Sequence, residues 1–514
     1  MQGFTEIEKA QIRLFGELIF VNPFSVERTS IEKKLLGRRF RNLYEAWHSV
    51  NGELSVNGNL AAINQLSEQL VERGLQGCAR TEGEEFLDSW DLLVMYWLFG
   101  KYSGPMCRNI YLGINAESEN ALLFRYFNAD FVRAVHFPGR SRKSDYSAEN
   151  IFALFHQIHR AFNYIFDFIA GGSMAAAQMR SSIWQSIFTY DLRRYYRQMY
   201  SRMDGITTLI CGESGTGKEL VARSIAFSQF IPFNARKHKF DEVYLNCFHP
   251  VQLSAMPQTL VESELFGHAK GAFTGAISEV KGYFETCRKC GSIFLDEIGD
   301  VSPETQSKLL RLLQTRQFNR IGDTRQLSFQ GKVIAATNKD LFKQCQEGSF
   351  RSDLFFRICS DTIHTAPLRQ LIDGHEEELR KFVVMLAKRM LEGEDAQVFA
   401  DKCGDWIMAN LGVDYAWPGN VRELEQCLRN LLIRGEYRPP AKEDASRHDC
   451  QEDFFSSCRM TADELMRRYI GAIYRREGTI AATSTITGLD RRTVKKYLVS
   501  SNSAEGYVLH EGRQ

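Results

Sequence analysis

The sequence predicts a multidomain α/β protein, with a parallel sheet in the central part of the chain and helical regions on either side. Three observations lead to this prediction. Between residues 181 and 435, short apolar segments alternate with helical stretches, as expected for strands joined by crossover helices. A glycine-rich loop at 212–219 joins one such segment to a helix. Before residue 173 and after residue 460, apolar residues recur at helical spacing.

The composition is typical of a globular protein of about three domains. The chain has 514 residues, 44% of them hydrophobic, and a net charge of +1, which excludes a globally basic nucleic-acid coat but not a local basic patch. There are 12 cysteines, the start is not secretory and no apolar run could span a membrane, so we expect reduced thiols and a cytoplasmic location. We expect a regulatory domain at 1–173, a central domain at 181–435, a linker at 436–459 and a small helical domain at 460–500.

The first 173 residues are mostly helical in pattern but match no domain type. Tyr96–Phe99 and Asn109–Gly113 fit either a strand or a buried helix, and Gly171–Ser173 reads as a hinge. An acid cluster with a phospho-acceptor aspartate after an opening strand is missing, so control by ligand, partner or redox state stays open. The helices that we predict are Glu8–Phe20, Ile31–Val50, Leu60–Leu75 and Ile151–Ile169.

A phosphate-binding loop is the first chemical motif. The apolar strand Thr207–Cys211 is followed by the loop and then by a helix, so that backbone N–H groups and the helix dipole face an anion. Lys218 is expected to reach the β and γ phosphates. The usual Ser or Thr after this lysine is replaced by Glu219, so Mg²⁺ must gain its protein contact elsewhere. The loop consists of Gly212, Glu213, Ser214, Gly215, Thr216, Gly217, Lys218 and Glu219.

A second apolar strand, Gly291–Glu297, ends in two acids. Neighbouring side chains on a strand point to different sides, so the two acids can have different roles. We expect Asp296 to hold Mg²⁺, directly or through water, and Glu297 to orient and deprotonate the attacking water.

Further motifs occur in a fixed order around these two. Gly271–Ala276 reads Gly-Ala-Phe-Thr-Gly-Ala, and its two glycines suit a mobile loop that presents Phe273 and Thr274. The other segments are two strand-like ones that end in polar residues, Tyr244–Cys247 and Val333–Asn338; Phe350–Arg357, with two arginines six apart; and Trp417–Leu424, where Asn420 could cap a helix.

Taken together, residues 181–435 resemble the bacterial enhancer-binding proteins, the AAA+ ATPases that activate sigma-54 RNA polymerase. The resemblance implies an AAA+ P-loop sheet with a small helical lid, ATP and Mg²⁺ as cofactors, and a homo-oligomeric ring, commonly a hexamer. It implies that Thr337 and Asn338 lie near the γ phosphate, that Arg422 faces a phosphate, and that Asn246 restrains the catalytic glutamate. It further implies that Arg351 and Arg357 reach the neighbouring subunit's nucleotide, and that Phe273 and Thr274 contact the sigma factor and promoter DNA.

The C-terminal region predicts a helix-turn-helix. Asp463–Ile470 is amphipathic, and Ile480–Leu489 and Arg491–Leu498 complete the pattern with Gly488 at the turn. From Arg459 to Leu498, nine Arg and Lys against four Asp and Glu leave a local charge of +5. The unit resembles the Fis-type domain that closes many members of this family, whose last helix would enter the major groove of double-stranded DNA. The candidate DNA contacts are Arg491, Arg492, Thr493, Lys495 and Lys496.

These features predict an ATP-dependent transcription activator that binds an upstream DNA site and remodels the closed complex of the sigma-54 polymerase holoenzyme. Two alternatives stay open, namely a nucleotide-sensing DNA-binding repressor and an AAA+ chaperone or protease partner. Cys287 and Cys290 are spaced for a metal but have no further ligands nearby, and His156 and His159 are expected to be core or interface residues.

Overall fold

The computed structural model describes residues 3–41, 58–77, 79, 83–137, 140, 143–439, 463, 466, 469–471, 473–474 and 478–499. The chain forms two compact units, 1–437 and 438–514. Within the described residues, no helix is long and apolar enough to cross a membrane.

A five-stranded parallel sheet forms the centre of the first unit, as predicted. Its strand order is β4-β5-β8-β1-β9. Every crossover is long enough for a helix, because parallel neighbours cannot be joined by a tight turn. The strands are β1 (Thr208–Cys211), β4 (Phe248–Gln252), β5 (Ser292–Asp296), β8 (Lys332–Thr337) and β9 (Asp361–His364).

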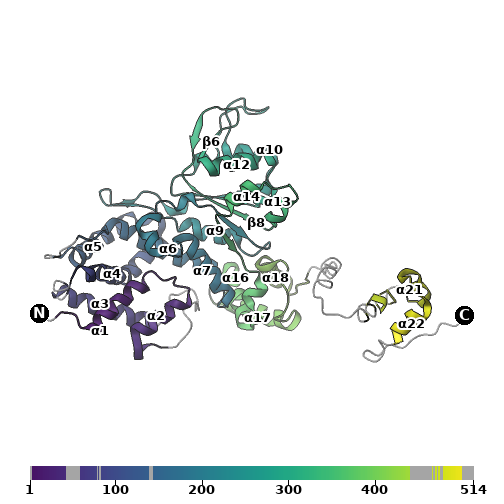
Figure 1. Ribbon diagram of the computed structural model, residues 1–514, viewed down its shortest axis with the longest axis horizontal. Helices are drawn as coiled ribbons and strands as arrows, with labels where there is room; N and C mark the ends of the chain where they lie inside the picture. The colour runs from purple at the N-terminus through teal and green to yellow at the C-terminus, as the bar shows by residue number, and fades with distance from the viewer. Residues whose placement is uncertain are drawn as a thin grey trace. The chain divides into compact units, whose positions relative to one another are not determined.

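Helices and two small hairpins cover this sheet. One hairpin, β2 (Phe233–Asn234) with β3 (Lys239–Phe240), lies before β4; the other, β6 (Gln317–Asn319) with β7 (Gln326–Ser328), lies before β8. In Figure 1 the second hairpin stands at the top of the unit, near α10 and α12. The helices are α9 (Lys218–Phe227), α10 (Gln258–Phe266), α11 (Tyr283–Thr286), α12 (Pro303–Thr315), α13 (Leu341–Gln346) and α14 (Ser352–Ile358).

The N-terminal region is helical, drawn in purple and blue in Figure 1. The two ambiguous segments, Tyr96–Phe99 and Asn109–Gly113, fall within or at the end of the 29-residue helix α4 (Glu84–Leu112), so the buried-helix interpretation is correct. The predicted helix Ile31–Val50 is wrong in its bounds: α2 ends at Leu36 because Gly37 takes a positive φ of 53°, and 42–50 lie outside the described residues. The remaining helices are α1 (Glu6–Leu18), α2 (Val26–Leu36), α3 (Gly58–Leu75), α5 (Glu117–Val135), α6 (Ala148–Phe168) and α7 (Met174–Phe188).

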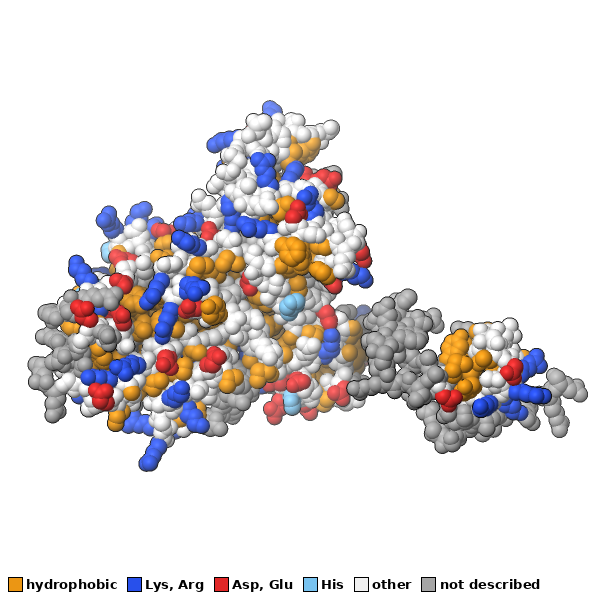
Figure 2. All heavy atoms as spheres, in the orientation of Figure 1, with side chains coloured by type: hydrophobic (Ala, Val, Ile, Leu, Met, Phe, Trp, Pro, Cys, Tyr) orange, Lys and Arg blue, Asp and Glu red, His pale blue; other side chains and the backbone are white. Residues whose placement is uncertain are grey.

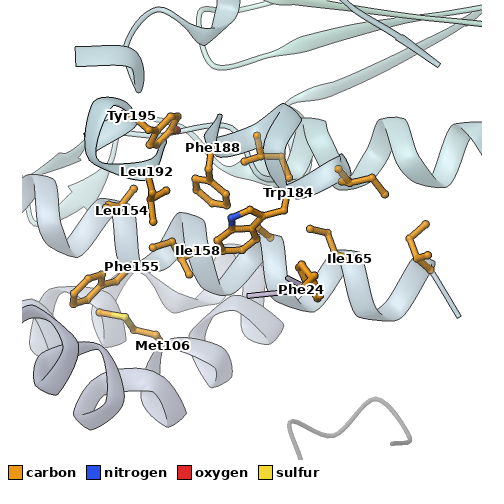
Figure 3. Packing of buried hydrophobic residues seen from close by; sticks show 14 of the residues in the cluster. Phe24, Met106, Leu154, Phe155, Ile158, Ile165, Trp184, Phe188, Leu192 and Tyr195 are labelled. Atoms are coloured by element: carbon orange, nitrogen blue, oxygen red, sulfur yellow. The ribbon is translucent and has the colours of Figure 1, made fainter. Parts of the chain in front are cut away.

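One hydrophobic core joins these helices to the sheet. Figure 3 shows Trp184 and Phe188 of α7 packed over Ile158 and Ile165 of α6, with Phe24 beside them. The same cluster of buried residues continues into α9 and the strands of the sheet. Residues 1–173 and 181–435, which we expected as separate domains, therefore share a core within one compact unit.

Four helices after β9 form the small helical subdomain that the sequence predicts. They are α15 (Leu368–Ile372), α16 (Glu376–Met390), α17 (Gly393–Asn410) and α18 (Asn420–Arg434). The segment Gly171–Ser173, which reads as a hinge, packs against this subdomain: the Gly172 N–H donates to Glu378 Oε2 at 2.5 Å. Ser173 then caps α7 by accepting from the Ala176 N–H. Gly171 and Gly172 thus allow the segment between α6 and α7 to lie close to α16.

The second unit contains α21 (Ile480–Thr487) and α22 (Arg491–Val499). Gly488 ends α21 in the left-handed conformation, with a φ of 68°, and the Asp490 carboxylate accepts from the Arg492 and Thr493 N–H groups at the start of α22. Both helices lie where the sequence predicts them. The predicted helix Asp463–Ile470 lies mostly outside the described residues.

Candidate functional site

The phosphate-binding loop connects the central strand β1 to the N-terminus of α9. Gly217 immediately precedes the helix in the left-handed conformation, with a φ of 86°, which favours glycine. Lys218 is buried, and its Nζ donates to the carbonyl oxygens of Gly212 and Glu213 at 3.0 and 3.2 Å. The ammonium group therefore lies across the mouth of the loop, where a phosphate oxygen could replace these carbonyls as its partner.

The small helical subdomain closes onto this loop through the start of α18. A Cβ on Gly215 would lie 2.3 Å from the Gly419 carbonyl oxygen, so only glycine permits this approach. The Asn420 Nδ2 donates to Glu213 Oε2 and to the Ser214 carbonyl oxygen at 3.1 and 3.0 Å. The predicted capping role of Asn420 is wrong, because Gly419 holds the cap position and the Asn420 side chain bridges to the loop. Arg422 reaches the loop as well, with its Nη1 3.2 Å from Ser214 Oγ.

Two residues that sequence patterns did not reveal also hold the loop. Arg369 of α15 forms a bidentate pair with Glu213, with distances of 3.0 and 2.6 Å, and this pair lowers the pKa of the Glu213 carboxyl. Thr216 Oγ1 lies 2.7 Å from Thr365 Oγ1, just after β9. Arg369 and Thr365 lie about 150 residues from their partners, so no local spacing signals them.

The two acids after β5 lie at the same edge of the sheet as the loop. Burial raises the pKa of Asp296, the neighbouring Glu297 carboxylate raises it further, and Lys218 lowers it, so these three groups share one electrostatic environment. Asn338, after β8, points its backbone N–H at Glu297 Oε2, 3.4 Å away, and Thr337 is fully buried at the end of that strand. Glu219 lies in the first turn of α9 and pairs with Arg223 at 2.8 Å.

The residues at this edge fit a magnesium ion held jointly with a nucleotide. Mg²⁺ in such sites takes one or two carboxylates and completes its octahedron with phosphate oxygens and water. Asp296 and Glu297 supply such carboxylates. Within the described residues there is no cluster of three or more metal-ligating side chains that could hold the ion without phosphate.

Asn246 does not lie with these groups. We predicted that Tyr244–Cys247 ends a strand. Instead, Tyr244–Asn246 is a short 3-10 helix, and the strand β4 begins only after it, at Phe248. Asn246 is therefore at the opposite end of the strand from the acids, roughly 20 Å away at 3.3 Å per residue. The polar residue that ends β4 beside Asp296 is Gln252, which is in register with it.

Arg351 precedes α14 and Arg357 lies in its last turn, and both are on the surface of the unit. Arg351 pairs with Asp353, with its Nη2 2.8 Å from the carboxylate, and donates to Ser307 Oγ at 3.1 Å. Arg357 donates from Nε and Nη2 to the Leu313 carbonyl oxygen at 3.2 and 3.0 Å. Both side chains are exposed, and their hydrogen bonds are with α12 and α14 rather than with the loop of the same subunit.

The hexapeptide Gly271–Ala276 lies in an exposed loop between α10 and α11. A hydrogen bond from the Gly271 N–H to the Ala276 carbonyl oxygen, 2.9 Å, closes the hexapeptide into a compact turn. Phe273 is 41% exposed and its ring packs edge-on against His268, while Thr274 is exposed. The loop thus presents both side chains that the sequence singled out.

The base of this loop is paired with the β6–β7 hairpin. The Ala269 N–H donates to the Ile321 carbonyl oxygen, and the Ile321 N–H donates to the Gly267 carbonyl oxygen, both at 2.9 Å. Arg320 of the hairpin forms ion pairs with Glu279 of the loop and, at 2.6 Å, with Glu285 of α11. Five residues after α11 the chain enters β5, which ends at the two acids, so the loop and the catalytic strand are close along the chain.

The predicted DNA contacts lie on α22. Val494 is buried against the rest of the small unit, whereas the four basic residues of this helix are exposed. Figure 2 shows Lys and Arg side chains gathered on this unit. The exposed basic residues are Arg491, Arg492, Lys495 and Lys496, and Thr493 at the helix start is half-buried.

Residues 188–364 match the family described as the Sigma-54 interaction domain. This segment, which holds the sheet and both phosphate-site motifs, is therefore similar to sigma-54 interaction domains. Over 230 residues it is 42% identical to the Nif-specific regulatory protein of Azotobacter vinelandii, a match that covers 45% of this chain and 40% of that protein. Over 306 residues it is 37% identical to the DNA-binding transcriptional activator HyfR of Escherichia coli, covering 56% and 43%. The chain thus spans less than half the length of these two relatives.

Among solved structures, that of NtrX from Brucella abortus is similar, with 23% sequence identity and a TM-score of 0.39 over 73% of this chain and 79% of that one. The family match covers the sheet and the loop Gly271–Ala276 but neither the N-terminal helices α1–α7 nor the second unit, except for the last residue of α7. The match therefore says nothing about the function of those parts.

Proposed function

We propose that this protein is an ATP-dependent transcription activator that binds upstream DNA and remodels the closed sigma-54 polymerase complex through the loop Gly271–Ala276. The observation that carries the proposal is the position of this loop. It is exposed at its tip, held at its base by the β6–β7 hairpin, and followed, after the short helix α11, by the strand that leads to Asp296 and Glu297. A repressor that only senses nucleotide has no need of such an exposed loop.

The residues around the phosphate-binding loop suit ATP hydrolysis. Backbone N–H groups of the loop and the N-terminus of α9 bind the phosphates, and Lys218 adds a positive charge. Asp296 holds Mg²⁺, which neutralises charge that develops on the phosphates. Glu297, at the exposed end of the strand, accepts a proton from the attacking water. Arg422 brings the small helical subdomain onto the same phosphates.

The exposed arginines favour a ring in which each subunit completes its neighbour's site. Arg351 and Arg357 are on the surface and point away from their own loop, as residues that act in trans must. An arginine supplied in trans stabilises transition-state charge and raises the rate by about 10³ to 10⁵. A closed assembly with this head-to-tail contact has cyclic symmetry. The ring size that we propose is a hexamer, as the resemblance to enhancer-binding proteins implies.

We propose two surfaces for macromolecular partners. Phe273 and Thr274 contact sigma-54 and promoter DNA, and the nucleotide state at Glu297 moves them through α11 and the β6–β7 hairpin. The second surface is α22, whose exposed basic residues neutralise phosphates while the helix enters the major groove.

A Glu297→Gln variant tests the enzymatic part. It keeps the shape of the side chain but cannot accept a proton, so we expect ATP to bind with unchanged affinity while turnover falls by about 10² or more, the usual contribution of a general base. Nucleotide binding and phosphate release measured on the full chain give both values. Glu347→Gln, an exposed acid outside the site, is the matched control. Normal turnover by Glu297→Gln would exclude this residue as the base.

A further inference from the structure

A second cavity lies where the N-terminal helices meet the segment between α9 and β4. Its volume is about 60 Å³, and it is lined by residues from α4, α5 and α6 on one side and from the β2–β3 hairpin and the following turn on the other. This cavity is separate from the nucleotide site, because none of its lining residues belongs to the phosphate-binding loop or to the strand ends that carry Asp296 and Thr337. Its polar lining includes Asn109, Glu117, Asn120, His156, Arg160 and Glu242.

Two of these polar side chains are buried without adequate partners. His156 is 4% exposed, and its Nε2 has no hydrogen-bond partner. Arg160, one turn along α6, is 3% exposed; its Nε and Nη2 donate to the carbonyl oxygens of His156 and Gln229 at 3.4 and 2.9 Å, and its guanidinium lies 5.2 Å from the Tyr244 ring centre. No ion pair between Arg160 and a carboxylate is present among the described residues. A buried guanidinium with only neutral partners is costly, and burial lowers the pKa of Arg160 accordingly.

We propose that this cavity binds a small metabolite that carries a single carboxylate, with the carboxylate on Arg160 and His156. A carboxylate matches the planar fork of the guanidinium and supplies the missing counter-charge. The amides of Asn109 and Asn120, which are hydrogen-bonded to each other at 2.9 Å, are available for a second polar group of the ligand.

Size and charge limit the ligand further. A water needs about 10 to 15 Å³ of such volume, so the cavity holds roughly four to six heavy atoms. Acetate and small amino acids have this size, whereas a nucleotide is far too large. Glu117 and Glu242 also line the cavity, and their negative charge disfavours a dianion more than a singly charged carboxylate or a zwitterion.

Helix α6, which lines the cavity, also contacts α9, the helix that follows the phosphate-binding loop. The same face of α6 that carries Arg160 also carries Gln157, whose Nε2 donates to the Ser228 carbonyl oxygen at 2.8 Å. One turn further along, the Tyr164 carbonyl oxygen accepts from Ser224 Oγ of α9 at 3.2 Å. A ligand on Arg160 therefore touches the helix that holds the C-terminal end of α9 in place.

Calorimetric titration of the full chain tests this site, with sodium acetate, L-alanine and inorganic phosphate as the probes at matched ionic strength. We expect saturable one-to-one binding of acetate or L-alanine. Binding should weaken by about tenfold or more in Arg160→Gln, which removes the charged donor. Since Arg160 also supports α6, a second variant, Val243→Phe, fills the cavity from its outer wall without touching the charge and should weaken binding as strongly.

Arg125→Gln, an exposed arginine on α5, is the matched control and should bind as the wild type does. Three outcomes would overturn the proposal: absence of saturable binding of both acetate and L-alanine, binding that Val243→Phe leaves unchanged, or phosphate that binds more tightly than either carboxylate. Since the readout is binding alone, it does not depend on whether the chain hydrolyses ATP or acts on sigma-54 polymerase.

Discussion

At the scale of single residues, Glu297 has an unusual backbone conformation. It follows β5 in the left-handed conformation, with a φ of 56°, which is uncommon for a residue other than glycine and costs about 1 kcal/mol or more. Its N–H donates to Asp296 Oδ1 at 3.1 Å, which fixes the turn. Such backbone strain often occurs at functional sites, which agrees with the different roles that we propose for the two carboxylates.

We propose Gln252 as the residue that restrains Glu297. It ends β4 beside Asp296, whereas Asn246 precedes that strand at its other end. We expect Gln252→Ala to change the ATP turnover rate several-fold, since a single side-chain hydrogen bond contributes about 0.5 to 1.5 kcal/mol.

Asn246→Ala is the natural comparison, because it removes the same kind of side chain from the exposed 3-10 helix and should leave turnover unchanged. Steady-state phosphate release gives both rates. The opposite pattern, with only Asn246→Ala affected, would restore the assignment that the sequence first indicated.

At the scale of elements, the loop that contains Gly271–Ala276 is bound to the β6–β7 hairpin. Two backbone hydrogen bonds join the base of the loop to the hairpin, Arg320 of the hairpin pairs with Glu279 of the loop, and Ala272 packs against Gly322 at the hairpin turn. Since the hairpin leads into β8, whose end lies at the nucleotide site, a change at Asn338 can reach the loop by this second path as well as through α11.

The Thr274→Ala variant tests whether action on the sigma-54 complex can be lost without loss of ATP hydrolysis. Thr274 is exposed at the loop tip, so its removal should leave turnover within about twofold of the wild type, as for surface substitutions in general, and abolish action on the sigma-54 complex. Ser278→Ala, an exposed residue of the same loop outside the hexapeptide, is the control and should retain both activities. If Thr274→Ala lost both activities together, the loop would instead support ring assembly.

At the scale of the whole molecule, the N-terminal helices share the core of the sheet rather than forming an appended domain. Phe152 of α6 and Phe124 of α5 pack against Phe233 of the β2–β3 hairpin, with ring centres 4.9 and 4.7 Å apart. Each such buried side chain contributes about 1.5 to 3 kcal/mol.

Deletion of residues 1–173 should consequently destabilise the remainder. It uncovers the apolar face of α7, including Trp184 and Phe188, and we expect the fragment to aggregate or to bind hydrophobic dyes. Deletion of 438–514 removes a separate compact unit and should leave the thermal unfolding of the rest unchanged. A fragment 174–514 that unfolds cooperatively at the wild-type temperature would contradict the shared core.

The parts that could be predicted from the sequence are those with local signals. The strand ends at Asp296 and Thr337, the loop before Lys218 and the helix-turn-helix around Gly488 were all found, because each rests on a few adjacent residues. The pairing of Arg369 with Glu213, the bridge from Asn420 and the fusion of the N-terminal helices with the sheet depend on residues far apart in sequence. The sequence places Asn246 at the end of a strand, whereas it precedes β4, and only the register of β4 with β5 identifies Gln252 as the residue beside Asp296.

The central claim is that hydrolysis at Glu297 drives the sigma-54 polymerase complex open. Its most direct test is the formation of open promoter complexes by purified sigma-54 polymerase on DNA with an upstream site for this protein. We predict that the full chain with ATP yields open complexes and that Glu297→Gln with ATP yields none. If the full chain hydrolysed ATP and bound the DNA but formed no open complexes, the account would be contradicted and the repressor alternative favoured.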